Sequence, residues 1–132
     1  MSSQGFNWNG KTILIAEDIE QNFLLMLAIL RFTEVTLVHA ENGQEAIDFV
    51  TNDPGISIVL MDLKMPVMDG LDATRKIKSI RKSLPIIAIT AYAFSSDEKI
   101  AMSAGCDDYL TKPVKKELLF KKLEAHGIPV NR

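Results

Sequence analysis

Three acidic residues directly follow two apolar runs of the sequence, and carboxylates in this pattern can bind a metal or act as a nucleophile. Asp62 follows the run Ile56–Met61, and Glu17 and Asp18 follow the run Thr12–Ala16. A charge at the end of a buried strand has no packing role, because burying an unpaired charge is costly. We therefore interpret Asp62 as a functional residue at the mouth of a ligand crevice.

The two runs would bring three carboxylates to one place if they were neighbouring strands of a parallel sheet, and the carboxylates would then repel one another. A hard divalent cation removes this repulsion. Mg²⁺ prefers one or two carboxylates together with water and a phosphate oxygen. The alternative is that Glu17 and Asp18 only cap a helix that begins near Ile19, as acidic residues often do. Their coincidence with Asp62 favours the Mg²⁺ site.

A hydroxyl and a cation follow two other apolar runs. Thr90 ends the run Ile86–Thr90, and Lys112 comes shortly after the run Asp108–Leu110. Thr90 could be an ordinary strand residue and Lys112 a solvated loop charge. Together with the acids at one edge of a sheet, however, they are the groups that hold a phosphoryl group while a carboxylate attacks it.

The elements that must position these residues alternate along the chain. Apolar runs predict strands, and segments with helical spacing predict a helix after each strand. The predicted strands are Thr12–Ala16, Val35–His39, Ile56–Met61, Ile86–Thr90 and Asp108–Leu110, and the predicted helices are Ile19–Phe32, Gly43–Thr51, Leu71–Ser83, Ser96–Ala104 and Lys115–His126. Right-handed crossovers then favour a doubly wound α/β fold of the flavodoxin-like type, a five-stranded parallel sheet in the order 2-1-3-4-5 with helices on both faces.

Local signals agree with these boundaries. Asn42 with Glu45, and Ser95 with Glu98, have the spacing of a capping box, in which each side chain binds a free backbone N–H at the start of a helix. Gly105 follows a predicted helix where the chain needs a left-handed residue.

Length and composition predict a single globular domain, since the chain has 132 residues, of which 47% are hydrophobic and 24% charged. We interpret residues 1–10 as a linker or N-terminal arm, residues 11–127 as the domain, and residues 128–132 as a tail. Phe6 and Trp8 of the arm can pack back on the domain. A net charge of −2 gives no general attraction to nucleic acid or to anionic lipid.

A cytoplasmic location is the simplest interpretation of the remaining features. The longest apolar run, Phe23–Leu30, is less than half of the ~20 residues that a membrane span needs. The single cysteine, Cys106, fits a reducing compartment and is best explained as a packing residue. His39 and His126 lack the spacing and the cysteine partners of a zinc site.

These motifs together resemble the receiver domain of two-component response regulators. The similarity covers about residues 11 to 126, with the landmarks in order: Glu17-Asp18, Asp62, Met65-Pro66-Val67-Met68-Asp69-Gly70, Thr90-Ala91 and Lys112-Pro113. Four features are most similar to receivers of hybrid sensor histidine kinases: Trp8, Ile15-Ala16-Glu17-Asp18, Asn22 and the segment Ala104–Leu110.

The resemblance implies that Asp62 accepts a phosphoryl group from a phosphohistidine of a histidine kinase or a histidine phosphotransfer domain. Mg²⁺ would be bound by Glu17, Asp18, Asp62 and the backbone carbonyl of Lys64. The protein would then be a signalling phosphoacceptor in a phosphorelay and not a turnover enzyme, because it would catalyse only its own phosphoryl transfer and dephosphorylation.

The resemblance also implies roles for residues at the other strand ends. Thr90 and Lys112 would each bind a phosphoryl oxygen, and the Lys112-Pro113 bond would be cis. Tyr109 matches an aromatic switch residue whose rotamer follows Thr90, so that phosphorylation changes a partner surface. The alternative for Tyr109 is a half-buried tyrosine of an edge strand.

Two residues on the rim of the predicted pocket are specific to this chain. Lys64 comes two positions after Asp62, and Tyr92 comes two positions after Thr90. A long cation and a bulky ring beside the acyl phosphate would block attack by water, which predicts slow self-dephosphorylation. The alternative is that both side chains point into solvent.

The first predicted helix is apolar around its whole circumference over Phe23–Leu30, whereas a helix on one face of a sheet needs only one apolar stripe. Exposed apolar surface usually marks a partner site. Because this helix docks on the helical partner in receivers, we predict that Leu25, Met26 or Ile29 contacts the partner. The alternative is that the N-terminal arm or self-association covers it.

Three other classes of protein fit less well. Phosphatases with an aspartate nucleophile have a second acid two residues later, where this chain has Lys64. A nucleotide-binding domain needs a glycine-rich loop after the first strand, and Glu17–Glu20 contains no glycine. A module that only binds partners would not need the acids, the hydroxyl and the lysine together.

Overall fold

The computed structural model describes residues 8–65, 68–91 and 95–127. The strands are β1 (Thr12–Ala16), β2 (Thr36–Ala40), β3 (Ile56–Asp62), β4 (Ile86–Thr90) and β5 (Asp108–Thr111). The helices are α1 (Glu20–Leu30), α2 (Gly43–Asn52), α3 (Gly70–Ile80), α4 (Ser95–Ala104) and α5 (Lys116–Ala125), with a short 3-10 helix (Arg31–Thr33) after α1. Every predicted strand and helix is present, and the ends differ from the predicted ones by at most three residues.

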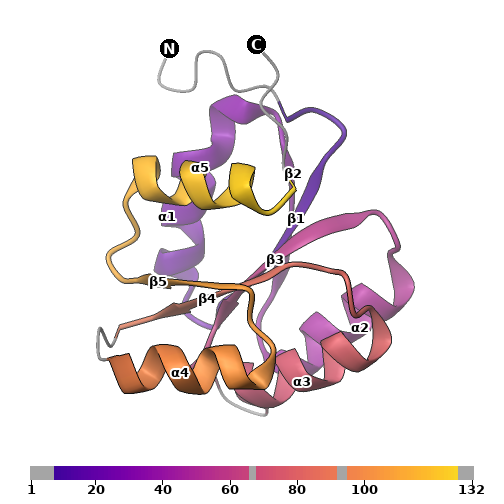
Figure 1. The fold of residues 1–132 in the computed structure, drawn as a ribbon. Helices are drawn as coiled ribbons and strands as arrows, with labels where there is room; N and C mark the ends of the chain where they lie inside the picture. Colours follow the sequence, from indigo (N-terminus) through magenta and orange to yellow (C-terminus); the bar gives the residue numbers. More distant parts are fainter. Residues whose placement is uncertain (1–7, 66–67, 92–94, 128–132) are drawn as a thin grey trace.

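The strands form a parallel sheet in the order β2-β1-β3-β4-β5, which confirms the predicted doubly wound α/β fold. Helices α1 and α5 cover one face of the sheet, and α2, α3 and α4 cover the other (Figure 1). Because helices cover both faces, the central strands bury nearly every side chain, and this is why they read as unbroken apolar runs.

Two hydrophobic clusters fill the space between the sheet and its helices. The cluster beside α2, α3 and α4 contains Leu14 of β1, Met61 of β3 and the buried Cys106, whose predicted packing role is confirmed. The cluster beside α1 and α5 contains Ile13 and Ile15 of β1. Alternate residues of one strand therefore serve opposite faces, as the pleat of a strand requires.

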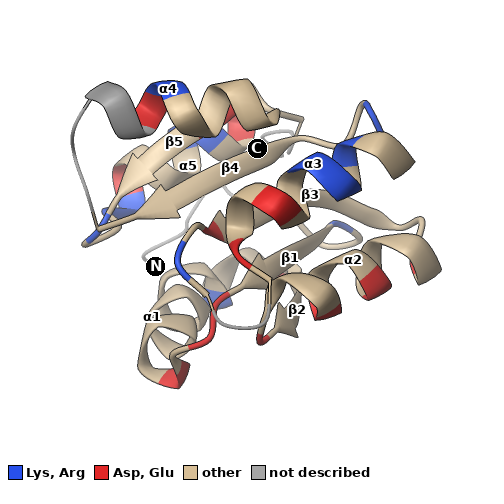
Figure 2. Cartoon of the chain, turned by 90° about the horizontal axis from the view of Figure 1, so that it is seen from below, with Lys and Arg blue, Asp and Glu red and all other residues tan. Residues whose placement is uncertain are grey.

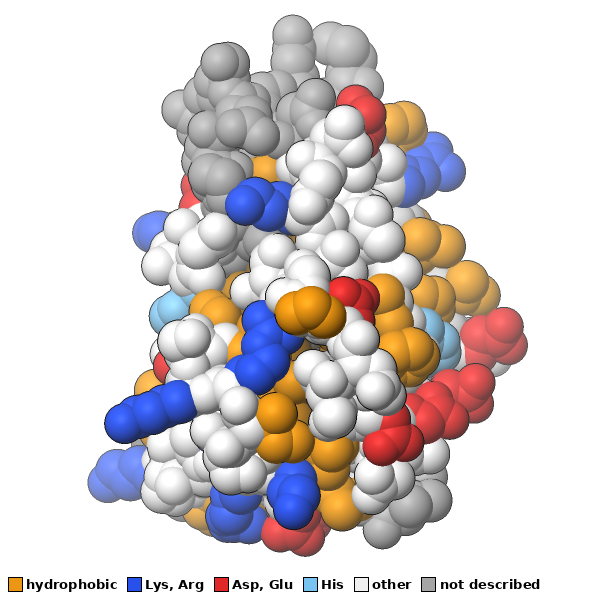
Figure 3. Space-filling model, turned by 90° about the vertical axis from the view of Figure 1, so that its right-hand side faces the viewer, with side chains coloured by type: hydrophobic (Ala, Val, Ile, Leu, Met, Phe, Trp, Pro, Cys, Tyr) orange, Lys and Arg blue, Asp and Glu red, His pale blue; other side chains and the backbone are white. Residues whose placement is uncertain are grey.

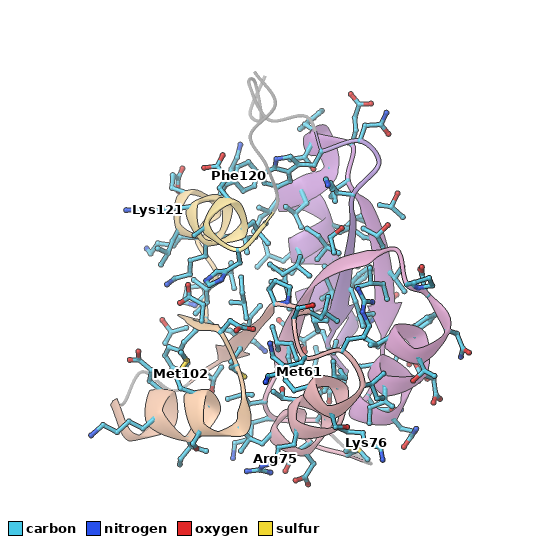
Figure 4. All side chains as sticks on the ribbon, turned by 45° about the vertical axis from the view of Figure 1, so that its right-hand side comes forward. Met61, Arg75, Lys76, Met102, Phe120 and Lys121 are labelled. Atoms are coloured by element: carbon cyan, nitrogen blue, oxygen red, sulfur yellow. The ribbon has the colours of Figure 1, made fainter. Side chains whose placement is uncertain are left out.

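Trp8 belongs to the folded domain. Its side chain is fully buried, and its ring centroid lies 5.0 Å from that of Phe120 on α5. Phe120 lies on the side of α5 that faces α1 (Figure 4). The backbone N–H of Trp8 donates to the carbonyl of Thr33, with a distance of 2.6 Å. The expected packing of Trp8 is therefore confirmed, whereas Phe6 lies outside the described residues.

The first predicted capping box begins α2. The backbone N–H of Glu45 donates to Oδ1 of Asn42 at 2.8 Å, while Oε1 of Glu45 accepts from the N–H of Glu41 and not from that of Asn42. Gly105 has a φ of 115°, which confirms its left-handed position after α4. The second predicted box begins at Ser95, whose side chain lies outside the described residues.

Helix α1 buries only part of its apolar surface. Leu24 is 48% exposed and Leu25 is 46% exposed, whereas Met26 is only 4% exposed and packs in the cluster beside the sheet. The prediction that Met26 contacts a partner was therefore wrong. An all-apolar helix sequence does not reveal which side faces the sheet, because it has no polar face to mark the solvent side. In the part of the chain that the structure describes, no helix is long and apolar enough to cross a membrane.

Asp108, at the start of β5, joins the strand to the end of α5. Its two carboxylate oxygens bind Lys122 Nζ at 2.6 Å and His126 Nε2 at 2.8 Å. Burial alone would raise the pKa of Asp108, but hydrogen bonds from Lys122, His126 and the N–H of Tyr109 outweigh it and lower this pKa below its ordinary value. The charged form of Asp108 therefore stabilises the fold.

We expect Asp108→Asn to lower the free energy of unfolding at neutral pH by about 1 kcal/mol, the upper end for an ion pair open to solvent. Since the pKa of Asp108 is lower in the folded state than in the unfolded chain, its contribution is present above the unfolded pKa and is lost as the pH falls through the folded pKa. Urea unfolding at a series of pH values should show the wild type and the variant converging in acid. Asp72→Asn, which removes an exposed i,i+3 pair with Arg75, is the control and should change stability little. A difference for Asp108→Asn that does not shrink in acid would contradict the assignment.

Candidate functional site

The carboxyl ends of β1 and β3 bring three predicted acids together. Carboxylate oxygens of Glu17, Asp18 and Asp62 lie within 4.8 Å of one another. The two strands are neighbours, and Ala16 at the end of β1 lies opposite Met61, the residue before Asp62. Asp62 is 4% exposed and Glu17 is 5% exposed, whereas Asp18 lies on the surface. Figure 2 shows acidic segments gathered in the loops between the start of α1 and α3.

Lys112 reaches this acidic cluster from the end of β5. Its Nζ lies 3.1 Å from Oδ2 of Asp62 and 3.2 Å from Oε1 of Glu17. Burial disfavours the charged form of the ammonium, but the two carboxylates outweigh burial and raise the pKa of Lys112 above its ordinary value. The lysine is therefore a permanent positive charge beside Asp62 and not a solvated loop residue.

The charges of the cluster do not cancel. Burial and the neighbouring carboxylate of Asp62 raise the pKa of Glu17 above its ordinary value, although Lys112 opposes this. Three carboxylates face one ammonium among the described residues, which leaves an excess of negative charge in a largely buried place. The donors are all hard oxygen atoms, so this set of residues fits a hard divalent cation such as Mg²⁺.

The helix-cap alternative holds only for Glu17, and only for one contact at the start of α1. The N-cap residue of α1 is Ile19, whose own side chain makes no capping hydrogen bond. Glu17 Oε2 accepts from the N–H of Ile19 at 3.3 Å, which is a contact within the loop. Glu17 and Asp18 are therefore positioned by the end of β1, which lies beside the end of β3 that carries Asp62.

The segment after β3 holds Asp62 through its backbone. The N–H of Lys64 donates to Oδ1 of Asp62 at 3.0 Å, and the N–H of Gly70 donates to the carbonyl of Leu63 at 3.2 Å. Asp69 Oδ1 accepts from the N–H of the third residue of α3 and so caps this helix, a role that the sequence analysis did not assign. The Asp-Gly pair after an apolar strand is the signal that could have revealed it.

A side chain at position 70 would meet the backbone. A Cβ on Gly70 would clash with the carbonyl oxygen of Asp62 and would lie 2.8 Å from the Cα of Leu63. The start of α3 thus packs directly against the backbone that carries Asp62. Only glycine allows this approach.

Thr90 and Tyr109 lie in β4 and β5, at the positions that the sequence predicted. Thr90 is buried at the end of β4, one residue beyond Ile89, which pairs with Asp62. The carbonyl of Thr90 accepts from the N–H of Lys112 at 2.7 Å, so the end of β4 helps to position the lysine. Tyr109 is partly buried against the cluster beside α2, α3 and α4.

Three other expectations concern the Lys112-Pro113 bond and the two rim residues, Lys64 and Tyr92. The Lys112-Pro113 bond is cis, as the resemblance implied. The side chain of Lys64 is exposed, so a position at the rim agrees with the structure. Tyr92 lies outside the described residues, and its predicted role stays a prediction.

A cavity of about 310 Å³ opens beside Asp62, between α1 and the loop that follows β5. Glu17, Lys112 and Asn22 contribute polar groups to its wall. The remaining lining residues are Ile15, Ala16, Leu25, Met26, Ile89, Pro113 and Val114. A partly apolar cavity therefore leads to the acidic cluster from the side of α1.

Comparisons with known proteins agree on one family. The model of the response regulator receiver domain matches residues 13–124. The hybrid signal transduction histidine kinase I of Dictyostelium discoideum is 36% identical over 117 residues, which cover 83% of this chain but only 7% of that relative. The chain therefore spans a small part of the length of this curated relative.

Two solved structures are similar in both fold and sequence. One is the receiver domain of the response regulator Ssk1 of Saccharomyces cerevisiae, crystallised with the histidine phosphotransfer signalling protein Ypd1. It has a TM-score of 0.84 and 32% identity, and the match covers 91% of this chain and 90% of that one. The other is the receiver domain of the sensor histidine kinase PA1611 of Pseudomonas aeruginosa, with a magnesium ion coordinated in its active site cleft. Its TM-score is 0.82 with 34% identity, and the match covers 89% of this chain and 97% of that one.

Proposed function

This chain belongs to the receiver domains of two-component response regulators, and we propose that Asp62 is its phosphoacceptor. The observation that carries the proposal is the position of Asp62, a buried carboxylate at a strand end with Lys112 at 3.1 Å and Glu17 and Asp18 within reach of the same ion. Such a site stores a signal as an acyl phosphate and performs no turnover on other substrates.

The proposed step is an attack by a carboxylate oxygen of Asp62 on the phosphorus of a phosphohistidine. The P–O bond forms as the P–N bond breaks, and the leaving imidazole takes up a proton. Lys112 pairs with one phosphoryl oxygen, and the hydroxyl of Thr90 donates to another. Glu17, Asp18, Asp62 and the carbonyl of Lys64 would hold Mg²⁺, which supplies positive charge to the phosphoryl oxygens when it is bound.

The experiment that tests this function is incubation of the protein with Mg²⁺ and a small phosphodonor, followed by intact mass measurement. We expect one phosphate adduct that needs Mg²⁺ and that decays slowly. A protein that never gains phosphate would favour a module that only binds partners. Continuous release of phosphate from the donor would favour a phosphatase.

We further propose that the phosphodonor is a histidine kinase or a histidine phosphotransfer domain in the cytoplasm, and that it docks on α1. The similarity to a receiver that crystallised with a phosphotransfer protein supports this type of partner. Leu25 links two features, since it is exposed on α1 and also lines the cavity that leads to Asp62. Figure 3 shows exposed hydrophobic side chains beside acidic ones on one face of the molecule. Ile29, which was also predicted to dock, is partly buried against the cluster beside the sheet.

We expect Leu25→Gln to slow phosphoryl transfer from the protein partner about tenfold, which corresponds to ~1.4 kcal/mol of lost contact energy. Labelling by a small phosphodonor should be unchanged, because this donor needs no docking surface. Rapid-quench measurement of the two transfer rates checks this. The matched control is Ile80→Gln, a change of an exposed side chain on α3. Equal loss with both donors would contradict docking at Leu25.

The lifetime of the acyl phosphate tests the two rim residues. If Lys64 and Tyr92 shield the phosphate from water, replacing both with alanine should shorten its half-life by up to about tenfold, equivalent to ~1.4 kcal/mol in the barrier to hydrolysis. Loss of the phosphate adduct from the purified phosphoprotein over time measures this. Lys76→Ala serves as the control, since Lys76 points away from the sheet on α3 (Figure 4). An unchanged half-life in the double variant would mean that both side chains leave the line of attack open.

A further inference from the structure

The end of β2 holds the backbone of Glu17 through both its N–H group and its carbonyl group. The N–H of Glu17 donates to the carbonyl of Ala40 at 2.9 Å. The carbonyl oxygen of Glu17 lies 2.7 Å from Nε2 of His39. A carbonyl can only accept a hydrogen bond, so Nε2 of His39 carries the proton and donates it.

The imidazole of His39 is itself held in place. Its ring stacks on the ring of Phe23, with the centroids 3.9 Å apart and the planes 3° from parallel. Phe23 lies on α1 and packs against the cluster beside the sheet. Two elements, β2 and α1, therefore orient a donor toward one backbone oxygen in the loop between β1 and α1.

This backbone oxygen belongs to a residue of the acidic cluster. Glu17 contributes a nearly buried carboxylate that faces Asp62 and Lys112. Mg²⁺ demands near-ideal octahedral geometry, so small changes in the position of a ligand weaken its binding. Groups that hydrogen-bond behind the ligands of a metal control this geometry.

We propose that His39 is a positioning residue for the Mg²⁺ site, acting through its hydrogen bond to the carbonyl of Glu17. The inference rests on the proposed function, because it presumes that Glu17 and its neighbours bind Mg²⁺. His39 touches neither the acceptor carboxylate nor the phosphoryl group. Its effect is to fix the loop from which the carboxylates of Glu17 and Asp18 project.

Two substitutions separate this role from general packing. His39→Leu removes the donor and keeps an apolar side chain against Phe23, while His39→Gln restores an N–H donor of similar reach. Isothermal titration calorimetry with Mg²⁺ alone should show binding about tenfold weaker for His39→Leu. Binding by His39→Gln should lie within about twofold of the wild type. The melting temperatures without Mg²⁺ should be similar for the two variants.

A control variant shows whether destabilisation alone affects the metal site. His126→Leu breaks the contact between the end of α5 and Asp108 of β5, and it should lower the melting temperature without changing Mg²⁺ affinity. Wild-type affinity in His39→Leu would overturn the inference and leave the proposed function intact. A fall of both the Mg²⁺ affinity and the melting temperature in His39→Leu and in His39→Gln would also overturn the inference, because it would indicate a general packing role. A wild-type protein that binds no Mg²⁺ would overturn the proposed metal site and the role of His39 with it.

Discussion

Asp62→Asn is expected to abolish phosphorylation by both a protein donor and a small phosphodonor. The amide is a poor nucleophile and carries no charge, so the variant loses both the attacking oxygen and part of the attraction for Mg²⁺. The loss should reach the detection limit, which means at least about a thousandfold in rate, or ~4 kcal/mol. The fold should persist, because the amide has nearly the same shape and its oxygen can still accept from the N–H of Lys64.

Intact mass measurement after incubation with Mg²⁺ and the phosphodonor checks this result. Asp48→Asn, a change of an exposed carboxylate on α2, is the matched control and should label like the wild type. Circular dichroism of both variants shows whether the fold is retained. A phosphate adduct on Asp62→Asn at the wild-type rate would place the acceptor elsewhere in the chain.

Gly70→Ala has the second largest expected effect, and it reaches Asp62 through the backbone. The added methyl group would collide with the carbonyl of Asp62 and would approach the Cα of Leu63 to 2.8 Å. The obstructing atoms are all backbone atoms and cannot rotate away. We expect the free energy of unfolding to fall by about 2–3 kcal/mol, as in overpacked sites. Labelling of Asp62 by a small phosphodonor should also slow, because relief of the clash moves the end of β3 or the start of α3.

Urea unfolding and the rate of labelling measure the two effects. Gly55→Ala is the control, because the Cβ at position 55 would meet only the flexible carboxylate of Asp53, at 3.1 Å. Its cost should stay under about 1 kcal/mol. If Gly70→Ala were as stable and as reactive as Gly55→Ala, the close packing of α3 on the strand end would have no functional importance.

The acidic cluster was predictable because a simple rule connects sequence and space. Parallel strands have their carboxyl ends at one edge of the sheet, so Asp62 at one strand end and Glu17 at another had to meet once the strand order was known. The same rule brought Lys112 to the site from the fifth strand, although its contacts of 3.1 Å and 3.2 Å required the structure.

Helix α1 shows where pattern reasoning fails. Its sequence is apolar on all sides, so no polar face distinguished the buried Met26 from the exposed Leu25. The packing of the helix on the sheet made that choice. The exposed leucines remain consistent with a docking surface, whereas Met26 serves the core and the wall of the cavity beside Asp62.

The sequence by itself determined where the strands and helices lie and which residues end each strand, because hydrophobic periodicity is a local property of the chain. Only the tertiary structure decided how those residues are held. His39 meets the carbonyl of Glu17 across 22 positions of sequence, and Gly70 packs on Asp62 across the loop after β3. Such contacts depend on the distance between elements after packing, which no local pattern records.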